Sequence, residues 1–308
     1  MTYRHTTILA SILLAGWALQ EAEAQEPYPR IGEVGFNARL PFFTHDPTVP
    51  LEGRIVREWK EGDGFRQKFV FRGAQGFLVP GYVELPAKAP RPTPLVLLLH
   101  GWSGSKENWY EDDTYVYGGL MRKALLGKGF AIAAIDAAAH GERSNEIDYQ
   151  HVNPFEDPSA PARKNYFTFA EIAIQTTKDY RRLLDYLAGR GDIDMDRVGI
   201  VGYSMGGMDS FYLMAVEPRI KTVVACVPPL AAESYDPASP IDYTWGVKGK
   251  PLLLIMGIQD DMYDRGKVDA SYREYIESAR SKLVWYDDGH RLSKKYVKEA
   301  AKWIVKSL

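Results

Sequence analysis

Short apolar runs recur along the chain and outline the predicted fold. Five of them consist of consecutive apolar residues, as expected of strands that are buried on both faces. Two earlier runs, 67–71 and 77–85, are also typical of strands, and the second alternates apolar positions around Pro80-Gly81, which indicates a bulge or bend. The predicted buried strands are 95–99, 130–135, 198–201, 222–227 and 252–256, and a last strand is expected at 284–286.

Helical periodicity fills the intervals between these runs. In 169–187, apolar residues recur three or four positions apart, and charged residues cover the opposite face. Helices are also expected at 207–216, 267–280 and 294–308. Because strands and helices alternate, the chain is predicted to be an α/β protein with a mostly parallel central sheet and helices on both faces.

Three segments depart from this alternation. Residues 25–50 are rich in proline and glycine, and 25–64 is expected to be an extended N-terminal lead-in to a catalytic domain at 65–308. Segments 145–165 and 228–250 carry prolines and follow predicted strands. Open α/β sheets bind ligands beyond the carboxyl ends of their strands, so both segments are expected to be short lid-like insertions beside a pocket.

The first residues have the features of a secretory signal. Arg4 and His5 give a positive start, 8–19 is apolar, and Ala22-Glu23-Ala24 forms a small-x-small cleavage site. At about 1.5 Å per residue, the apolar stretch is too short for a hydrocarbon core of roughly 30 Å. A signal peptide at 1–24 therefore predicts a secreted or periplasmic protein without a stable membrane span after cleavage. An uncleaved anchor or a buried helix is the alternative.

Composition narrows the range of partners. The formal net charge is −2, and no cluster of lysine and arginine indicates nucleic-acid binding. Cys226 is the one cysteine, which excludes an internal disulfide, and its apolar surroundings predict a small buried core residue. No metal-binding spacing is found, so neither a metal nor a cofactor is expected.

The run Gly202-Tyr203-Ser204-Met205-Gly206 carries the strongest chemical signal. It has the spacing G-x-S-x-G, follows a short apolar strand and opens a predicted helix. A sharp strand-to-helix turn needs glycines on both sides of the serine and exposes its hydroxyl. The same turn points the N–H of Met205 toward a developing oxyanion. Ser204 is therefore predicted to be a nucleophile, and a glycine-rich structural turn is the alternative.

A serine nucleophile needs a base and an acid that orients the base. Among the six histidines, His290 alone follows Ser204 in the chain, and it comes just after the last predicted strand. The order serine, acid, histidine predicts His290 as the base. Asp260, which follows strand 252–256, is the expected acid; Asp261 is its rival and Asp264 a weaker candidate. Each of these residues could instead be a surface side chain.

The second oxyanion donor is expected in the loop after strand 95–99. The N–H of Trp102 is predicted to join that of Met205. His100 is interpreted as a structural residue that holds this loop by hydrogen bonds. Aromatic residues crowd the following stretch, where they either line a pocket or serve as packing: Trp102, Trp109, Tyr110, Tyr115 and Tyr117.

Together these motifs resemble the α/β-hydrolase superfamily, in particular its dienelactone hydrolase-like, acetyl xylan esterase-like and prolyl oligopeptidase-like branch. The resemblance covers about residues 65–308. It implies a Ser204–His290–Asp260 triad and gives Asp136 no catalytic role beyond ordering the turn at 139–141. Dienelactone hydrolases usually have a cysteine nucleophile, and prolyl oligopeptidases carry a propeller domain absent here. The motifs are His100–Gly104, Asp136–Ser144, Asp196–Gly207, Gly257–Asp260 and Gly289-His290.

The resulting prediction is a serine carboxylic ester hydrolase that acts on short-acyl esters through an acyl-enzyme. Its substrate would be a small-molecule or polysaccharide-linked ester. A peptidase or amidase on the same triad is the first alternative. A binding protein that keeps the fold without the chemistry is the second, and acyl transfer to an alcohol is the third.

Overall fold

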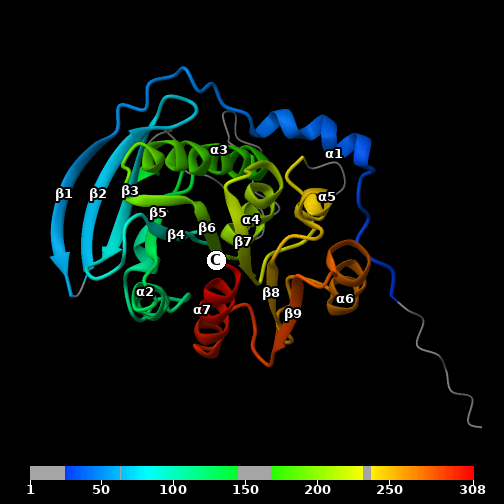
Figure 1. Cartoon of the computed structure of the whole chain (residues 1–308). Coiled ribbons are helices and arrows are strands. Elements are labelled where there is room, and N and C mark those ends of the chain that lie inside the picture. Colours follow the sequence, from blue (N-terminus) through cyan, green and yellow to red (C-terminus); the bar gives the residue numbers. More distant parts are fainter. Residues whose placement is uncertain (1–24, 63, 145–167, 232–236) are drawn as a thin grey trace, which may run out of the picture.

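The computed structural model describes residues 25–62, 64–144, 168–231 and 237–308, and all statements below concern these residues. Nine strands of this part form one sheet in the order β1-β2-β3-β5-β4-β6-β7-β8-β9 (Figure 1). The strands are β1 (Arg54–Glu61), β2 (Gly64–Arg72), β3 (Leu78–Pro86), β4 (Thr93–Leu99), β5 (Ala131–Ile135), β6 (Ile193–Tyr203), β7 (Ile220–Cys226), β8 (Leu252–Gly257) and β9 (Ser281–Tyr286).

The sheet has an antiparallel edge and a parallel body. The pairs β1–β2, β2–β3 and β3–β5 are antiparallel. From β5 onward, in the order β5-β4-β6-β7-β8-β9, neighbouring strands are parallel. The parallel strands all end at one edge of the sheet. Loops that follow β4, β6, β8 and β9 therefore meet there, which is the arrangement expected of a ligand site in an open α/β sheet.

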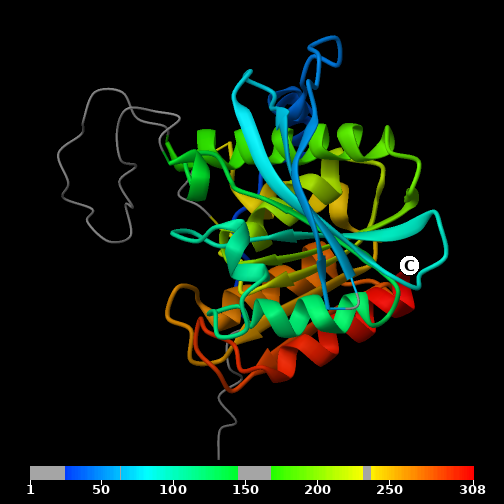
Figure 2. The same ribbon diagram turned by 90° about the vertical axis from the view of Figure 1, so that its left-hand side faces the viewer.

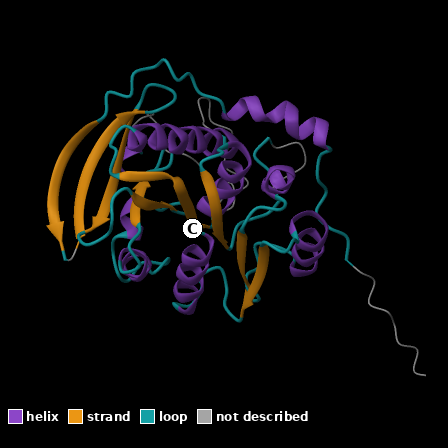
Figure 3. Ribbon diagram, viewed as in Figure 1, coloured by secondary structure: helices purple, strands orange, loops and turns teal. Residues whose placement is uncertain are grey.

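Helices cover both faces of the sheet, as Figures 2 and 3 make plain. Residues Leu95, Leu97 and Leu99 of β4 pack in the cluster that includes α3, whereas Val96 and Leu98 pack in the cluster of α2 and α7. This alternation means that each central strand is buried on both sides, which stabilises the fold by roughly 1.5–3 kcal/mol per large apolar side chain. The helices are α1 (Glu33–Arg39), α2 (Gly118–Leu126), α3 (Phe169–Ala188), α4 (Met205–Val216), α5 (Thr244–Val247), α6 (Arg265–Ser271) and α7 (Lys295–Ser307).

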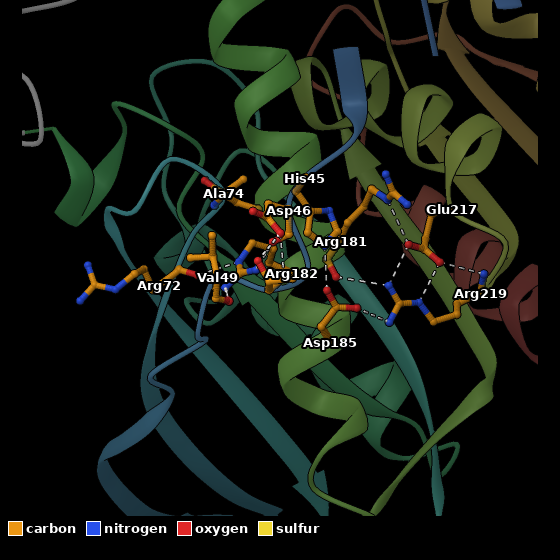
Figure 4. Close-up of polar contacts among 12 residues, drawn as sticks. His45, Asp46, Val49, Arg72, Ala74, Arg181, Arg182, Asp185, Glu217 and Arg219 are labelled. Atoms are coloured by element: carbon orange, nitrogen blue, oxygen red, sulfur yellow. Dashed lines mark hydrogen bonds and ion pairs between the residues drawn. The ribbon is translucent and has the colours of Figure 1, made fainter. Parts of the chain in front are cut away.

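The residues from 25 to 50, called the N-terminal segment below, run along the outside of α4 and α3. Arg182 of α3 is almost fully buried, and its guanidinium donates to the carbonyl oxygens of Val49 (2.9 Å) and Asp46 (3.3 Å) (Figure 4). The neighbouring Arg181 donates to the carbonyl of Phe43 (2.7 Å), whose ring is buried. Two adjacent arginines thus hold this segment against the helix.

The central prediction of a mostly parallel sheet with helices on both faces is confirmed. The helices expected at 169–187 and 294–308 correspond to α3 and α7. The helix expected at 267–280 is shorter, because α6 passes into a π-turn that ends at Ile276. The segment expected to be an extended lead-in contains regular structure, namely α1 and β1. The domain boundary at residue 65 stays a prediction.

The bulge or bend expected at Pro80-Gly81 is absent. Strand β3 pairs with β2 in unbroken register, with Gly81 opposite Phe69. A Cβ on Gly81 would lie 2.4 Å from the ring of Phe69 and 2.8 Å from the side chain of Ile135. The glycine is therefore explained by the space that a core ring needs, rather than by a break in the strand.

Several predictions fall outside the described residues. The signal peptide at 1–24 and the insertion at 145–165 lie there, as do residues 232–236 of the second insertion. The described remainder of that second insertion holds a short 3₁₀ turn (Pro240–Tyr243) and α5. No helix in the described part of the chain is both long and apolar enough to cross a membrane.

Candidate active site

Ser204 occupies a strained turn between β6 and α4. Its φ of 54° and ψ of −116° lie in a region that residues other than glycine rarely adopt. The turn is tight because the flanking glycines have no room for a side chain: a Cβ on Gly202 would lie 2.1 Å from the carbonyl oxygen of Gly206. The N–H of Ser204 donates to the carbonyl of Cys226 (2.8 Å), which joins the turn to the end of β7.

His290 and Asp260 lie in line with this serine. The Oγ atom of Ser204 is 2.9 Å from Nε2 of His290, and Nδ1 of His290 is 2.7 Å from Oδ2 of Asp260. An ionised carboxylate can only accept, so the proton of the neutral imidazole belongs on Nδ1 and Nε2 accepts from the serine hydroxyl. The Asp260 side chain is fully buried, whereas that of His290 is one-third exposed (33%). The histidine can therefore be reached from solvent while its acid cannot.

The structure separates the three aspartates that the sequence left as candidates. Asp260 faces His290, and its second oxygen accepts from the N–H of Met262 (3.1 Å). Asp261 is exposed. Asp264 caps the first turn of α6 by accepting from the N–H of Lys267 (3.0 Å), which is an ordinary structural role.

The loops that carry Asp260 and His290 are joined to each other. The N–H of Gln259 donates to the carbonyl of Asp288 (2.9 Å), and the Gln259 amide donates to the Asp287 carboxylate (2.9 Å). A Cβ on Gly257 would lie 2.5 Å from the carbonyl oxygens of Asp288 and Gly289. The glycine at the end of β8 thus allows the two backbones to approach closely.

The loop after β4 lies against Ser204. A Cβ on Gly101 would lie 3.2 Å from Cβ of Ser204, and the N–H of Gly101 donates to the hydroxyl of Tyr115 (2.7 Å). Trp102, the predicted second oxyanion donor, is the next residue. Its ring packs on Phe169 (5.2 Å between centroids) beside Met205 and the alanines of 137–139.

His100 holds this loop, as predicted. Its Nδ1 lies 2.8 Å from the carbonyl oxygen of Gly101, and its Nε2 accepts from the N–H of Ala137 (2.9 Å). These partners require a proton on Nδ1 and none on Nε2. Burial lowers the pKa of His100, which favours this neutral form. The interpretation of His100 as a structural residue is confirmed.

Asp136 connects the same loop to the end of β5. Its buried carboxylate accepts from the backbone N–H (2.8 Å) and the ammonium group (2.7 Å) of Lys106, and from the N–H of Glu142 (3.0 Å). Burial alone lowers the pKa of Lys106, but the attraction of Asp136 and Glu142 outweighs it, so that the pKa is raised. The carboxylate therefore orders the turn at 141–142, close to the predicted role, and it also anchors the residues that follow Trp102.

The aromatic residues after this loop are mainly packing. Trp109 is fully buried under the α2 and α7 face, and Tyr110, Tyr115 and Tyr117 pack against the same cluster. Trp102 alone among the five belongs to the small apolar cluster beside Met205. Cys226 is buried, as predicted, and burial raises the pKa of its thiol. Within the described ranges, no group of three or more potential ligands could hold a metal ion.

Sequence reasoning missed two tyrosines of the site. Tyr203 stands inside the G-x-S-x-G run, and its hydroxyl reaches the backbone of the His290 loop. Tyr115 holds Gly101. The motif leaves position 203 unspecified, and Tyr115 was named only as one of several aromatic residues for a pocket or for packing, so neither hydrogen bond to the backbone was predicted.

Comparison with known proteins agrees with this architecture. A family model described as "alpha/beta hydrolase fold" matches residues 94–284, and the chain therefore belongs to that family. The predicted superfamily is thereby confirmed. Acetyl xylan esterase 1 from Thermoanaerobacterium sp. JW/SL YS485 superposes with a TM-score of 0.65 at 18% identity, covering 92% of this chain and 95% of that one. Such low identity shows a shared fold alone.

Two relatives found by sequence match only part of the chain. The 20-hydroxy-prefusarin hydrolase FUS2 of Gibberella moniliformis is 28% identical over 155 residues, which is 49% of this chain and 31% of that protein. The 2,6-dihydropseudooxynicotine hydrolase of Paenarthrobacter nicotinovorans is 26% identical over 152 residues, 49% of this chain and 32% of that protein. The matched region thus spans about a third of these two relatives.

Proposed function

We propose that the chain is a serine carboxylic ester hydrolase that acts through Ser204, His290, Asp260 and an acyl-enzyme. The observation that carries the proposal is the continuous hydrogen-bonded line from Ser204 Oγ through the imidazole to the buried Asp260 carboxylate. The strained backbone of Ser204 adds support, because strain in a tight turn is retained where a side chain must be held in one place. Hydrolase names among the relatives agree with this class of reaction.

In the proposed reaction, His290 Nε2 takes the proton of Ser204 as its oxygen attacks the ester carbonyl. Asp260 stabilises the imidazolium that forms. His290 then protonates the leaving alcohol, and water releases the acid from the acyl-enzyme by the same steps.

The backbone N–H groups of Met205 and Trp102 are the proposed oxyanion donors. Met205 opens α4, and the N–H groups of a first helical turn have no acceptor within the helix. Trp102 follows Gly101, which lies against Ser204. One such donor is worth about 3 kcal/mol of barrier in a hydrolase of this kind.

A short-acyl ester, either a small molecule or one linked to a polysaccharide, is the proposed substrate. The apolar side chains beside Met205 form a small cluster, which is the proposed contact surface for a short acyl group. The fold is shared with an acetyl xylan esterase, which is consistent with this size of acyl group. Secretion or export to the periplasm is proposed from residues 1–24, and N-terminal sequencing of the exported protein tests cleavage after Ala24.

The first experiment compares hydrolysis of p-nitrophenyl acetate, butyrate and octanoate. Ser204→Ala should lower turnover by roughly 10⁴-fold or more. Ser210→Ala is the matched control, because Ser210 is a buried serine of α4, the helix that follows Ser204, and donates to the carbonyl of Gly207. Acetate should be the fastest of the three substrates, and a faster octanoate would refute the short-acyl proposal.

A second pair of variants tests the acid. Asp260→Asn should lower kcat by roughly 10³–10⁴-fold, whereas Asp261→Asn should leave it unchanged. Amides cleaved as fast as esters would indicate a peptidase instead. A folded protein whose Ser204 does not react with a fluorophosphonate would indicate a binding protein. Formation of a new ester from an added alcohol, in place of the free acid, would reveal acyl transfer.

A further inference from the structure

Tyr203 joins the serine strand to the histidine loop. Its side chain is fully buried at the end of β6. Its hydroxyl donates to the carbonyl oxygen of His290 (2.9 Å) and accepts from the N–H of Leu292 (2.8 Å). One hydroxyl thus satisfies two backbone groups that flank Arg291, immediately beside the proposed base.

The Tyr203 ring is fixed in place by the aromatic rings that pack against it. Tyr115 packs edge-on against it (5.5 Å, 82°), and Tyr296 of α7 packs on it at 5.8 Å and 65°. The His290 ring itself lies 6.4 Å away at 84°. Burial raises the pKa of Tyr203, so the hydroxyl keeps its proton and remains a donor at neutral pH.

The other hydrogen bonds of the loop that carries His290 do not join it to β6. The carbonyl of Asp288 accepts from Gln259, and the carboxylate of Asp288 accepts from the N–H of Ser293 (2.8 Å). These bonds fix the loop to the Asp260 loop and to itself. The Tyr203 hydroxyl instead fixes it to β6, one residue before Ser204. Ser204 Oγ and His290 Nε2, which are 2.9 Å apart, thus stand on two segments that the Tyr203 hydroxyl connects.

We propose that Tyr203 is a positioning residue for the ester hydrolysis proposed above: its hydroxyl holds the backbone of His290 at the distance and angle that proton transfer from Ser204 requires. The inference rests on the proposed function. It assigns a role to the position that the G-x-S-x-G spacing leaves open. The hydroxyl touches no reacting atom, so its effect passes through His290.

The test is Tyr203→Phe, which keeps the ring and removes both hydrogen bonds. Displacing a catalytic group by 1 Å can cost 100-fold, and a partial release of the loop should lower kcat for p-nitrophenyl acetate by about tenfold. The value of KM should stay within about twofold, because the hydroxyl contributes nothing to substrate binding. The rate of fluorophosphonate labelling of Ser204 should fall in parallel with kcat.

Tyr296→Phe is the matched control. Tyr296 is a fully buried member of the same ring cluster, and its hydroxyl donates to the carbonyl of Val116, which belongs neither to the Ser204 turn nor to the His290 loop. Both variants keep the ring and lose one buried hydroxyl, but Tyr203→Phe removes two hydrogen bonds and Tyr296→Phe removes the one to Val116. The Tm of both variants is therefore measured beside kcat, and kcat is compared at a temperature where both are folded. Tyr296→Phe should keep kcat within about twofold of the wild type.

The outcomes separate the inference from the proposed function. A wild-type protein that neither hydrolyses esters nor reacts with the fluorophosphonate refutes the function itself. An active wild type with Tyr203→Phe equal to Tyr296→Phe in kcat refutes the positioning role and leaves the function standing. If Tyr203→Phe does not fold, amide hydrogen exchange is measured on the wild type instead. The Leu292 N–H should then be as protected as the N–H groups of β6, and rapid exchange would refute its hydrogen bond to Tyr203.

Discussion

The buried pair of Asp136 and Lys106 offers the sharpest test of how the loop after β4 is supported. Both side chains are at most 1% exposed. The substitution Asp136→Asn keeps one acceptor oxygen but places an amide donor where the carboxylate accepted from three N–H groups. At least one buried donor then loses its acceptor, and the Lys106 ammonium loses a charged partner.

The expected cost follows from these contacts. Removing one partner of a buried ion pair typically costs about 3–5 kcal/mol, because the remaining charge is left unpaired. Lys106 retains Glu142 at 2.5 Å, and that carboxylate is 44% exposed. The lower end of the range, about 3 kcal/mol, is therefore expected. At roughly 2–4 °C per kcal/mol for a large domain, Tm should fall by about 6–12 °C.

The assay is urea and thermal unfolding of the wild type beside two variants. Asp112→Asn is the matched control, since it breaks the Asp112–Lys123 pair, whose side chains are both 56% exposed. Exposed pairs contribute little, so this control should unfold almost as the wild type does. If Asp136→Asn shifted Tm no more than Asp112→Asn, the reasoning from burial would be refuted.

Three further outcomes are expected. Gly206→Ala should abolish most fluorophosphonate labelling and cost about 1–3 kcal/mol, because its Cβ would lie 2.2 Å from the carbonyl oxygen of Leu99; normal labelling would contradict the geometry of the turn. Burial raises the pKa of Glu217, but hydrogen bonds and attraction from Arg219 prevail and lower it, so its stabilisation is present above pH about 4.3 and lost as pH falls through the lower folded value. Urea unfolding between pH 3 and 6 should therefore be steeper in pH for the wild type than for Glu217→Gln. The lowered pKa of His100 means that the unfolded state binds the extra proton first, so stability should decline below pH about 6.5, and His100→Asn should lose that part of the slope.

The sheet is predictable from the sequence because its central strands are buried on both faces. Such strands appear as continuous apolar runs, and β4, β7 and β8 were readable for that reason. Strand β1 is an exposed edge strand rich in charged residues, and α1 buries Phe36 alone. Neither element leaves an apolar period. Strand β1 is placed by its pairing with β2, the next strand in the chain, whereas α1 packs through Phe36 on residues of α4 and beyond, much later in the chain.

The candidate site also has residues that a local sequence pattern indicates and residues that it does not. Ser204 stands in a local motif, and its order relative to His290 restricts the base. The choice between Asp260 and Asp261 needs the direction of two adjacent side chains in a loop, which the sequence does not contain. The structure brings Ser204, His290 and Asp260 together, while their catalytic roles stay a proposal. Tyr203 was overlooked because its partners lie 87 and 89 residues further along the chain.

The N-terminal segment has a consequence for the order of folding. Its docking partners lie far along the sequence: the carbonyl of Pro50 meets Arg182 across 132 residues, and the N–H of Tyr28 meets Ser271 across 243. Closing loops of this length costs chain entropy before any contact repays it. The part of the described chain that is synthesised first is therefore expected to dock last, after α3 and α6 exist to receive it. Until that moment Arg181 and Arg182 lack the carbonyl acceptors that residues 25–50 supply, although Arg182 can still donate to the Arg72 carbonyl and Arg181 to Glu217. A ribosome-bound chain that ends before α6 should leave residues 25–50 open to protease.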